Sequence, residues 1–456
     1  MAALHKVFPF LARLLLGGTA LAVALGTGQA QAQIIIDPPR EITPPWNALR
    51  PLEPTPLPIL SEPETRDPEA PEDVPVRTRP RPEYAPRGLR VGPWMYYPTA
   101  TAGGFYDSNI FSSATDKQAD FASRFAAGLR AQSLWQRHSL DLRLVADTTN
   151  YRRNTSLNET NVDLSVNGRI DIDHGAQILG RFQAAYLHDD VGSLTSPTGA
   201  IEPTPYGFFS GDVTLRKQFG RFTASGGARV DRYDYGSVLA ANGVTINQDA
   251  RDGEIYTAHG RMDYAVSEKS SVFAAFENNW RDLRGTPTAS LNSNGYRALA
   301  GVNLELTRLI RGEFAAGYLR QKFASPTIGD VSGPAYRASL TWSPTRQIDV
   351  HFKTEQVVTT TSDTSPTAAL ATSFQLGADY EVRPNLIFSP LLIYEKDKFK
   401  GIPRDDNVYA AELRLKRLFN NWASASAYYR YLQRDSNIPV NSYEKHVIGI
   451  SASLQF

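Results

Sequence analysis

The segment Val162–Ile172 reads VDLSVNGRIDI, and its side chains alternate between two chemical types. On one face of an extended strand lie Val162, Leu164, Val166, Ile170 and Ile172, and on the other lie Asp163, Ser165, Asn167, Arg169 and Asp171. A strand of about 10 residues with one apolar and one polar face is typical of a transmembrane β-barrel. Because a bilayer offers no water to an open sheet edge, a sheet of such strands must close on itself.

The same alternation recurs from Leu89 to Phe456. Eighteen candidate strands are centred near residues 102, 128, 143, 166, 182, 213, 228, 260, 275, 301, 317, 339, 353, 375, 391, 413, 427 and 450. Every second connection is short, and the connections between them are long and polar. The short turns are Gln136-Arg137, Asp173–Gly175, Gly220-Arg221, Glu268–Ser270, Thr307–Arg311, Ser343–Arg346, Arg383–Asn385 and Asn420-Asn421. We therefore predict an all-β fold, a transmembrane antiparallel up-and-down β-barrel of about 18 strands, with about 16 as the alternative count.

Composition excludes several other classes of protein. The chain has 456 residues, no cysteine, a formal net charge of +1 and a mean hydropathy of −0.34. Without cysteine there is no disulfide scaffold, no thiolate metal site and no lipidated N-terminal cysteine. The hydropathy does not fit a helical membrane protein, and the small net charge gives no global attraction to nucleic acid.

Two segments precede the predicted barrel. Residues 1–32 have a basic start, a short apolar core and the small-residue pattern Ala30-Gln31-Ala32, which predicts a secretory signal peptide cut before Gln33. Residues 33–88 are rich in proline and in charges of both signs, which predicts a disordered, extended linker in the periplasm. That linker is either a spacer without a partner or an arm that contacts a periplasmic partner.

Aromatic residues cluster beside the predicted short turns, where a membrane-interface girdle is expected. They are Trp135, Phe219, Phe222, Trp342, Tyr380, Phe419 and Trp422. The chain ends in Phe456, with apolar residues at alternate positions before it. This ending predicts a signal for the barrel assembly machinery.

Several motifs resemble the putative β-barrel porin 2 family of outer-membrane proteins. They are Gly104–Ile110 (GFYDSNI), Glu202–Tyr206 (EPTPY), Arg232–Tyr235 (RYDY), Asn247–Asp252 (NQDARD), Ile310–Phe314 with Ala316–Leu319, and Gly329–Gly333. The resemblance covers most of residues 89–456 and leaves out the proline-rich segment. It implies a monomeric or trimeric outer-membrane barrel and brings no catalytic residues. Members of the family often resemble proteins associated with exopolysaccharide production.

The polar faces of the predicted strands place charged side chains toward the lumen. The inward basic positions are Arg124, Arg130, Arg143, Arg169, Arg181, Arg216, Arg229, Arg261, Arg297, Arg337, Arg414 and Arg430. The inward acidic positions are Asp141, Asp163, Asp171, Asp212, Asp231, Asp263, Glu305, Asp349, Glu355, Asp379 and Glu412. A nearly balanced wall predicts weak ion selectivity or a lumen laced with ion pairs. Tyr233, Tyr235 and Tyr428 add aromatic surface on which sugar rings can stack.

No sequence motif predicts an enzyme, a metal site or a cofactor. A barrel hydrolase would need a serine near His188, with Asp189 or Asp190 as the acid, but a hydrated loop histidine is the simpler interpretation. The loop carboxylates Asp249, Asp252, Asp405 and Asp406 offer oxygen ligands for calcium or lipopolysaccharide bridging, without the spacing of a calcium-binding loop.

The sequence thus favours a passive, weakly selective pore for small polar solutes or saccharides in the outer membrane of a Gram-negative bacterium. One alternative is an accessory component of exopolysaccharide secretion with little channel activity, and another is a barrel hydrolase. The expected partners are outer-membrane lipid, lipopolysaccharide and the assembly machinery, with no nucleic acid. The oligomeric state stays open.

Overall fold

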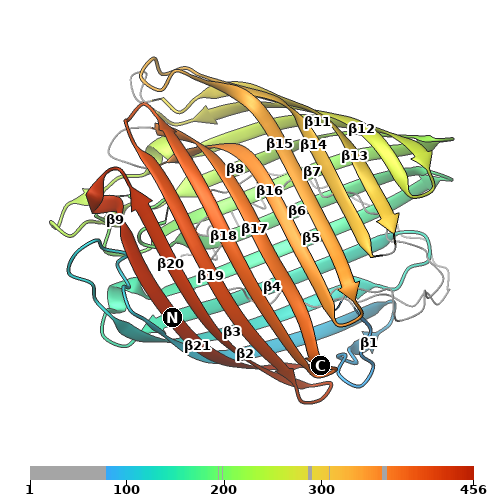
Figure 1. The fold of residues 1–456 in the computed structure, drawn as a ribbon, viewed down its shortest axis with the longest axis horizontal. Helices are drawn as coiled ribbons and strands as arrows, with labels where there is room; N and C mark the ends of the chain where they lie inside the picture. Colours follow the sequence, from blue (N-terminus) through green and yellow to red (C-terminus); the bar gives the residue numbers. More distant parts are fainter. Residues whose placement is uncertain are drawn as a thin grey trace.

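A computed structural model describes residues 76, 79–193, 195–197, 199–285, 290–307, 309–361 and 367–456 of the chain. The predicted signal peptide and most of the predicted linker lie outside the described residues. Within them, eighteen long strands form a barrel (Figure 1). These are β2 (Trp94–Asp107), β3 (Asp120–Ser133), β4 (Ser139–Tyr151), β5 (Glu159–Asp173), β6 (Ala176–Asp189), β7 (Thr204–Phe219), β8 (Phe222–Tyr235), β11 (Gly253–Ser267), β12 (Ser270–Leu283), β13 (Ser293–Thr307), β14 (Ile310–Phe323), β15 (Asp330–Thr345), β16 (Ile348–Thr361), β17 (Thr367–Arg383), β18 (Leu386–Lys400), β19 (Asp405–Leu418), β20 (Ala423–Ser436) and β21 (Tyr443–Gln455).

Short elements decorate the barrel. The strand β1 (Leu89–Val91) pairs with the start of β2, and β9 (Val238–Leu239) pairs with β10 (Thr245–Ile246) in a long loop. The 3-10 turns are η3 (Thr155–Leu157), η4 (Asp249–Arg251) and η5 (Pro439–Asn441). No helix among the described residues is long and apolar enough to cross a membrane.

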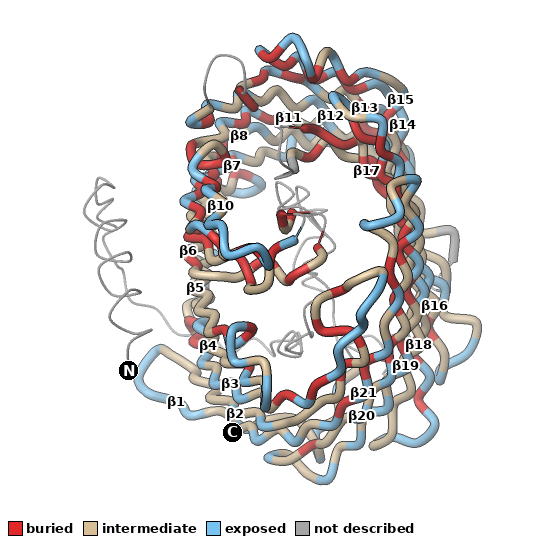
Figure 2. The backbone as a smooth tube through the Cα atoms, turned by 90° about the vertical axis from the view of Figure 1, so that its left-hand side faces the viewer, coloured by how far each residue is buried: buried red, intermediate tan, exposed pale blue. Residues whose placement is uncertain are grey.

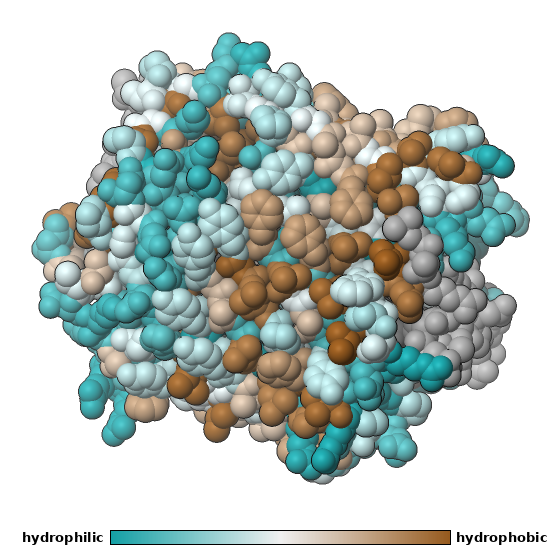
Figure 3. All heavy atoms as spheres, in the orientation of Figure 1, coloured by the Kyte–Doolittle hydropathy of each residue, from teal (hydrophilic) through white to brown (hydrophobic). Residues whose placement is uncertain are grey.

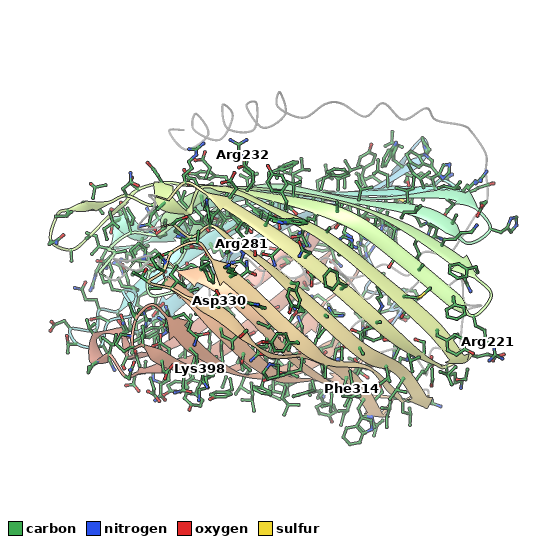
Figure 4. The ribbon with its side chains drawn as sticks, turned by 90° about the horizontal axis from the view of Figure 1, so that it is seen from above. Arg221, Arg232, Arg281, Phe314, Asp330 and Lys398 are labelled. Atoms are coloured by element: carbon green, nitrogen blue, oxygen red, sulfur yellow. The ribbon has the colours of Figure 1, made fainter. Side chains whose placement is uncertain are left out.

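The barrel closes through pairing of its first and last long strands. Each long strand pairs antiparallel with its neighbours in the chain, and β2 pairs with β21 from Thr99↔Gln455 to Asp107↔Val447. The predicted barrel is therefore confirmed, and each of the predicted strand centres falls within one of the long strands. The short turns gather at one end, marked by Arg221 in Figure 4, and the long loops at the other.

The outward face of the barrel is apolar in its middle. Exposed side chains such as Leu144, Val213, Phe276, Leu413 and Ile450 alternate along their strands with charged or small inward residues. Figure 3 shows this apolar surface across one side of the molecule, between more hydrophilic ends. An apolar exterior around a closed sheet is the arrangement that a bilayer requires.

Near the long-loop end, the wall departs from a simple cylinder. The ladder between β15 and β16 ends at Arg337↔Glu355, although β16 continues to Thr361 in its pairing with β17. Ala368 is fully buried in an apolar cluster that includes the inward side chains Phe273 and Leu319. The ends of β16 and β17 therefore turn into the barrel and pack against the inner face of β12–β15.

Arg281 links the wall to this turned-in segment. Its guanidinium Nη2 on β12 donates to the carbonyl oxygen of Val358 on β16 at 3.0 Å. Val358 and Leu370 are partly buried against the same apolar cluster. Local alternation of side chains does not predict this feature, because the contact that holds it joins residues 77 positions apart in the chain.

Glycine is required where two strands approach closely. A Cβ added at Gly317 on β14 would lie 1.9 Å from the carbonyl oxygen of Ala298, whereas one added at Gly333 on β15 would meet nothing within 4 Å. Gly317→Ala is therefore expected to destabilise the barrel by about 1–3 kcal/mol. Urea unfolding followed by heat-modifiable gel migration measures this, with Gly333→Ala as the matched control. Equal midpoints for the two variants would contradict the close approach.

Candidate functional site

The structure places the predicted charged residues on the inner face of the barrel, on the side opposite the exposed apolar side chains. Arg124 pairs with Asp147 and Arg130 with Asp141, at 2.8 and 2.7 Å. The buried Arg229 contacts Asp231 at 2.8 Å. The same inner face carries Arg143, Arg169, Arg181, Arg216, Arg261, Arg297, Arg337, Arg414, Arg430, Asp163, Asp171, Asp212, Asp263, Glu305, Asp349, Glu355, Asp379 and Glu412.

One network of ion pairs fills the side of the lumen bounded by β11–β16. Glu313 on β14 is 2% exposed and accepts from Arg261 and Arg337, each at 2.8 Å. Arg297 on β13 contacts Glu277 at 2.6 Å and Glu355 at 3.2 Å. Two of these contacts, Arg261 with Glu313 and Arg297 with Glu355, join strands that are not adjacent in the sheet, so they brace the wall from inside.

A second network lies on β19 and β20. Glu412 accepts from Arg414 and Arg430, at 2.8 and 2.7 Å. Nearer the long loops, the fully buried Asp406 accepts from Arg404 at 2.6 Å. Because most of these charges are matched locally, the lumenal field along this wall is weak despite the many ionised groups.

The loop between β6 and β7 enters the barrel. The Gly192 carbonyl accepts from the hydroxyl of Tyr443 on β21 at 3.1 Å, and the Val191 carbonyl accepts from Ser112 at 3.2 Å. Arg251, next to β11, donates to the carbonyl of Thr195 at 3.1 Å. The loop thus contacts wall segments on both sides of β6, and Figure 2 shows loop segments inside the ring of strands. It narrows the lumen at the long-loop end.

A small cavity of about 70 Å³ lies beside this loop. Its lining combines side chains from β2, β4, β5, β20 and β21 with residues of the loop, among them Tyr151, Glu159, Asp190, Tyr428 and Lys445. Aliphatic and aromatic groups form much of the remaining wall. The cavity therefore lies between the inward loop and the wall of the barrel.

At the opposite end, residues 76 and 79–81 bind the inner wall; we call them the strap. Val76 is fully buried, and its N–H donates to the Asp349 carboxylate. Arg79 and Arg81 both donate to Glu381 Oε2 on β17, at 2.9 and 2.6 Å. These residues belong to the segment for which the sequence predicts a disordered linker.

The strap also touches the short turns. Arg79 donates to the carbonyl of Arg346 between β15 and β16, and Arg81 Nε donates to the carbonyl of Pro384 between β17 and β18 at 3.0 Å. Farther along the chain, the Tyr84 carbonyl accepts from Gln455 on β21 at 3.1 Å. The segment therefore runs beneath the short-turn end from β21 to β16 and β17.

The predicted interface aromatics lie beside the short turns. Phe219, Phe222, Trp342, Tyr380, Phe419, Trp422 and the terminal Phe456 are all exposed on the surface. Trp135 is half-buried and packs edge-on against Trp94, with ring centroids 5.5 Å apart. This placement fits a girdle at the membrane interface.

The residues considered for an enzyme do not assemble into a triad among the described contacts. His188 Nδ1 lies 3.0 Å from Asn161 Oδ1, and Asp189 lies 3.5 Å from Arg251. The loop carboxylates also have local partners, since Asp252 accepts the N–H of Tyr235 at 2.7 Å and Asp249 accepts from Asn247 at 2.9 Å. Within the described ranges, no group of three acidic or histidine side chains is arranged to hold a metal.

The aromatic residues considered for stacking lie in two places. Tyr233 and Tyr235 are buried with Tyr206 and Phe208 on β7 and β8, whereas Tyr428 lines the cavity. Sequence reasoning missed the strap and the inward loop. One signal for the strap was available in the sequence. Arginine recurs at positions 77, 79 and 81, at the end of a segment in which charges of both signs are mixed.

A closed antiparallel barrel with an apolar exterior and a charged, loop-narrowed lumen defines the class of porin-like outer-membrane β-barrels. The model of the family described as putative β-barrel porin 2 matches residues 81–456, and the chain belongs to this family. The predicted resemblance is thereby confirmed. No curated protein sequence matches the chain.

Solved barrels are similar to this one at low sequence identity. OccK2 (OpdF) of Pseudomonas aeruginosa, crystallised with glucuronate, has a TM-score of 0.46 at 12% identity, covering 79% of this chain and 98% of that chain. A BenF-like porin from Pseudomonas fluorescens Pf-5 has a TM-score of 0.46 at 13% identity, covering 79% and 99%. OccK5 (OpdH) of Pseudomonas aeruginosa has a TM-score of 0.41 at 12% identity, covering 79% and 98%.

Removing the negative charge that holds the strap is expected to release it. Glu381→Gln removes the negative charge that Arg79 and Arg81 share, and loss of one charge from a buried ion-pair group is strongly unfavourable. Since the chain has no cysteine, Val76→Cys reports on release through maleimide labelling. We expect labelling at least about tenfold faster in the Glu381→Gln background, which corresponds to about 1.4 kcal/mol.

Two controls accompany this measurement. Val91→Cys, 63% exposed, gives the rate of an accessible thiol, and Glu444→Gln removes a carboxylate at the opposite end of the barrel. An unchanged labelling rate at residue 76 in Glu381→Gln would contradict the clamp.

Asp190, in the inward loop, makes stability depend on pH. Burial raises the pKa of its carboxyl from 3.8 to about 6. The folded state therefore loses stability as pH rises from about 4 to about 6, and the full cost is present above that range. Asp190→Asn should stabilise the barrel by about 1–3 kcal/mol at pH 7.5 and have little effect at pH 3.5.

Urea unfolding of the purified barrel at the two pH values tests this expectation. Asp249→Asn, which changes an exposed loop carboxylate, is the control. A stabilisation of equal size at both pH values would refute ionisation of Asp190 as the cause.

Proposed function

We propose that the protein forms a passive, weakly selective pore for small polar solutes or saccharides in the outer membrane. The observation that carries this proposal is the lumenal wall itself, where inward arginines and carboxylates are matched in pairs inside a closed barrel. Barrels of 16–18 strands are wide enough for an aqueous path, and balanced charge gives little preference for either sign of ion. Tyr428 in the constriction supplies a ring on which a sugar can stack.

The proposal includes export and orientation. A signal peptide over residues 1–32 would deliver the chain to the periplasm, and the C-terminal Phe456 would present it to the assembly machinery. The short-turn end, and the proline-rich segment with it, would then face the periplasm, as in other outer-membrane barrels. The barrel would contact lipid and lipopolysaccharide on its outer face.

Planar-bilayer recording of the protein purified from outer membranes tests the pore. We expect stable conductance steps with a cation-to-anion permeability ratio near about 1. Glu313→Gln removes the negative charge that Arg261 and Arg337 share, so the reversal potential should shift toward anion preference. Asp330→Asn, which removes the outward partner of Arg320, is the matched control and should shift nothing.

A second candidate function is a non-conducting accessory role in exopolysaccharide secretion. The observation that favours it is the amount of chain inside the barrel, namely the inward loop, the turned-in ends of β16 and β17, and the strap.

We propose no enzymatic activity, since His188 is engaged with Asn161. A folded, heat-modifiable barrel that gives no conductance steps would refute the pore and favour the accessory role.

A further inference from the structure

The cavity beside the inward loop has an unusual balance of charge. The two basic residues that line it, Arg430 and Lys445, each form a salt bridge with a carboxylate other than those of Glu159 and Asp190. Lys445 donates to Asp107 at 2.9 Å, and Arg430 donates to Glu412 at 2.7 Å. The carboxylates of Glu159 and Asp190 remain, and neither forms a salt bridge with a residue that the structure describes.

Glu159 is the more deeply buried of the two. The residue is only 8% exposed, and its Oε2 atom has no hydrogen-bond partner among the described residues. Asp190 approaches from the loop, where burial raises the pKa of its carboxyl to about 6, so it is ionised at neutral pH. Lys445 and Arg124 attract the Asp190 carboxylate from beyond salt-bridge distance, so they offset only part of the cost of burying it. A bound cation in direct contact would offset the rest.

The rest of the lining identifies the kind of cation. Phe105, Leu432 and Val447 form an apolar wall, and Tyr151 and Tyr428 present aromatic rings. Aromatic rings attract organic cations, and an apolar wall suits an alkyl chain better than the water shell of a metal ion. The arrangement of acidic groups also does not form a metal site within the described ranges.

The size of the cavity limits the ligand. One water occupies about 10–15 Å³ on this measure, so about 70 Å³ corresponds to roughly five waters. A solute with about five non-hydrogen atoms has a comparable bulk. This is the size of a short primary alkylammonium ion.

We propose that this cavity is a binding subsite for a small primary ammonium ion, held between Glu159 and Asp190 with its alkyl chain against Phe105 and Tyr428. This inference rests on the proposed pore in one respect only, because the pore is the route by which the solute reaches the cavity. It would make the constriction favour organic cations within an otherwise weakly selective lumen.

Isothermal titration of the detergent-solubilised protein with n-butylammonium chloride tests the subsite without any need for conductance. Butan-1-ol and sodium butyrate are probes of the same shape with neutral and negative head groups. We expect saturable binding of the ammonium ion and none of the other two at the same concentration. This comparison uses the natural chain, so it does not depend on the folding of a variant.

Substitution then locates the site. Glu159→Gln combined with Asp190→Asn should weaken n-butylammonium binding at least tenfold, while Glu444→Gln, outside the cavity, should leave it unchanged. Absence of saturable binding, equal binding of the alcohol, or an unaffected double variant would each overturn the inference.

The pore and the subsite fail in different ways. A protein that conducts but does not bind n-butylammonium refutes the subsite and leaves the pore intact. A protein that binds n-butylammonium but never conducts supports the subsite and refutes the pore.

Discussion

The ladder between β2 and β21 is the interaction on which the rest of the structure depends. A strand edge left open in hydrocarbon would expose backbone N–H and C=O groups that nothing could satisfy. Pairing from Thr99↔Gln455 to Asp107↔Val447 removes both edges at once. It joins the first and last of the long strands, so the lumen is enclosed only when all eighteen strands have paired.

Closure also decides where charge can go. With lipid outside, every ionised side chain on the strands either moves to the rim or enters the lumen. Inside, an unpaired charge is costly, so carboxylates such as Glu313 and Glu412 each accept from two arginines. The wall becomes rigid and nearly neutral. The lumen of this porin-like barrel is narrowed by segments that lie inside the ring of strands.

Three features do that narrowing, and each is held by specific contacts. The inward loop is tied to Tyr443 and Arg251, and the turned-in ends of β16 and β17 are buried against Phe273 and Leu319. The strap is clamped on Glu381. The inward loop lies at the long-loop end and the strap at the short-turn end, so the two can be changed separately by substitution.

The barrel, its strand centres, its short turns and the inward face of its charged residues followed from the sequence alone. They rest on alternation with a period of two, which is a local property of residues such as Val162–Ile172. Ion-pair partners did not follow, because Arg261 reaches Glu313 across intervening strands. The strap, the inward loop and the cavity between Glu159 and Asp190 were decided only by the tertiary structure. Their contacts join segments that lie far apart in the chain. The alternation of polar and apolar residues along a strand also does not show whether a polar side chain contacts water or a buried partner.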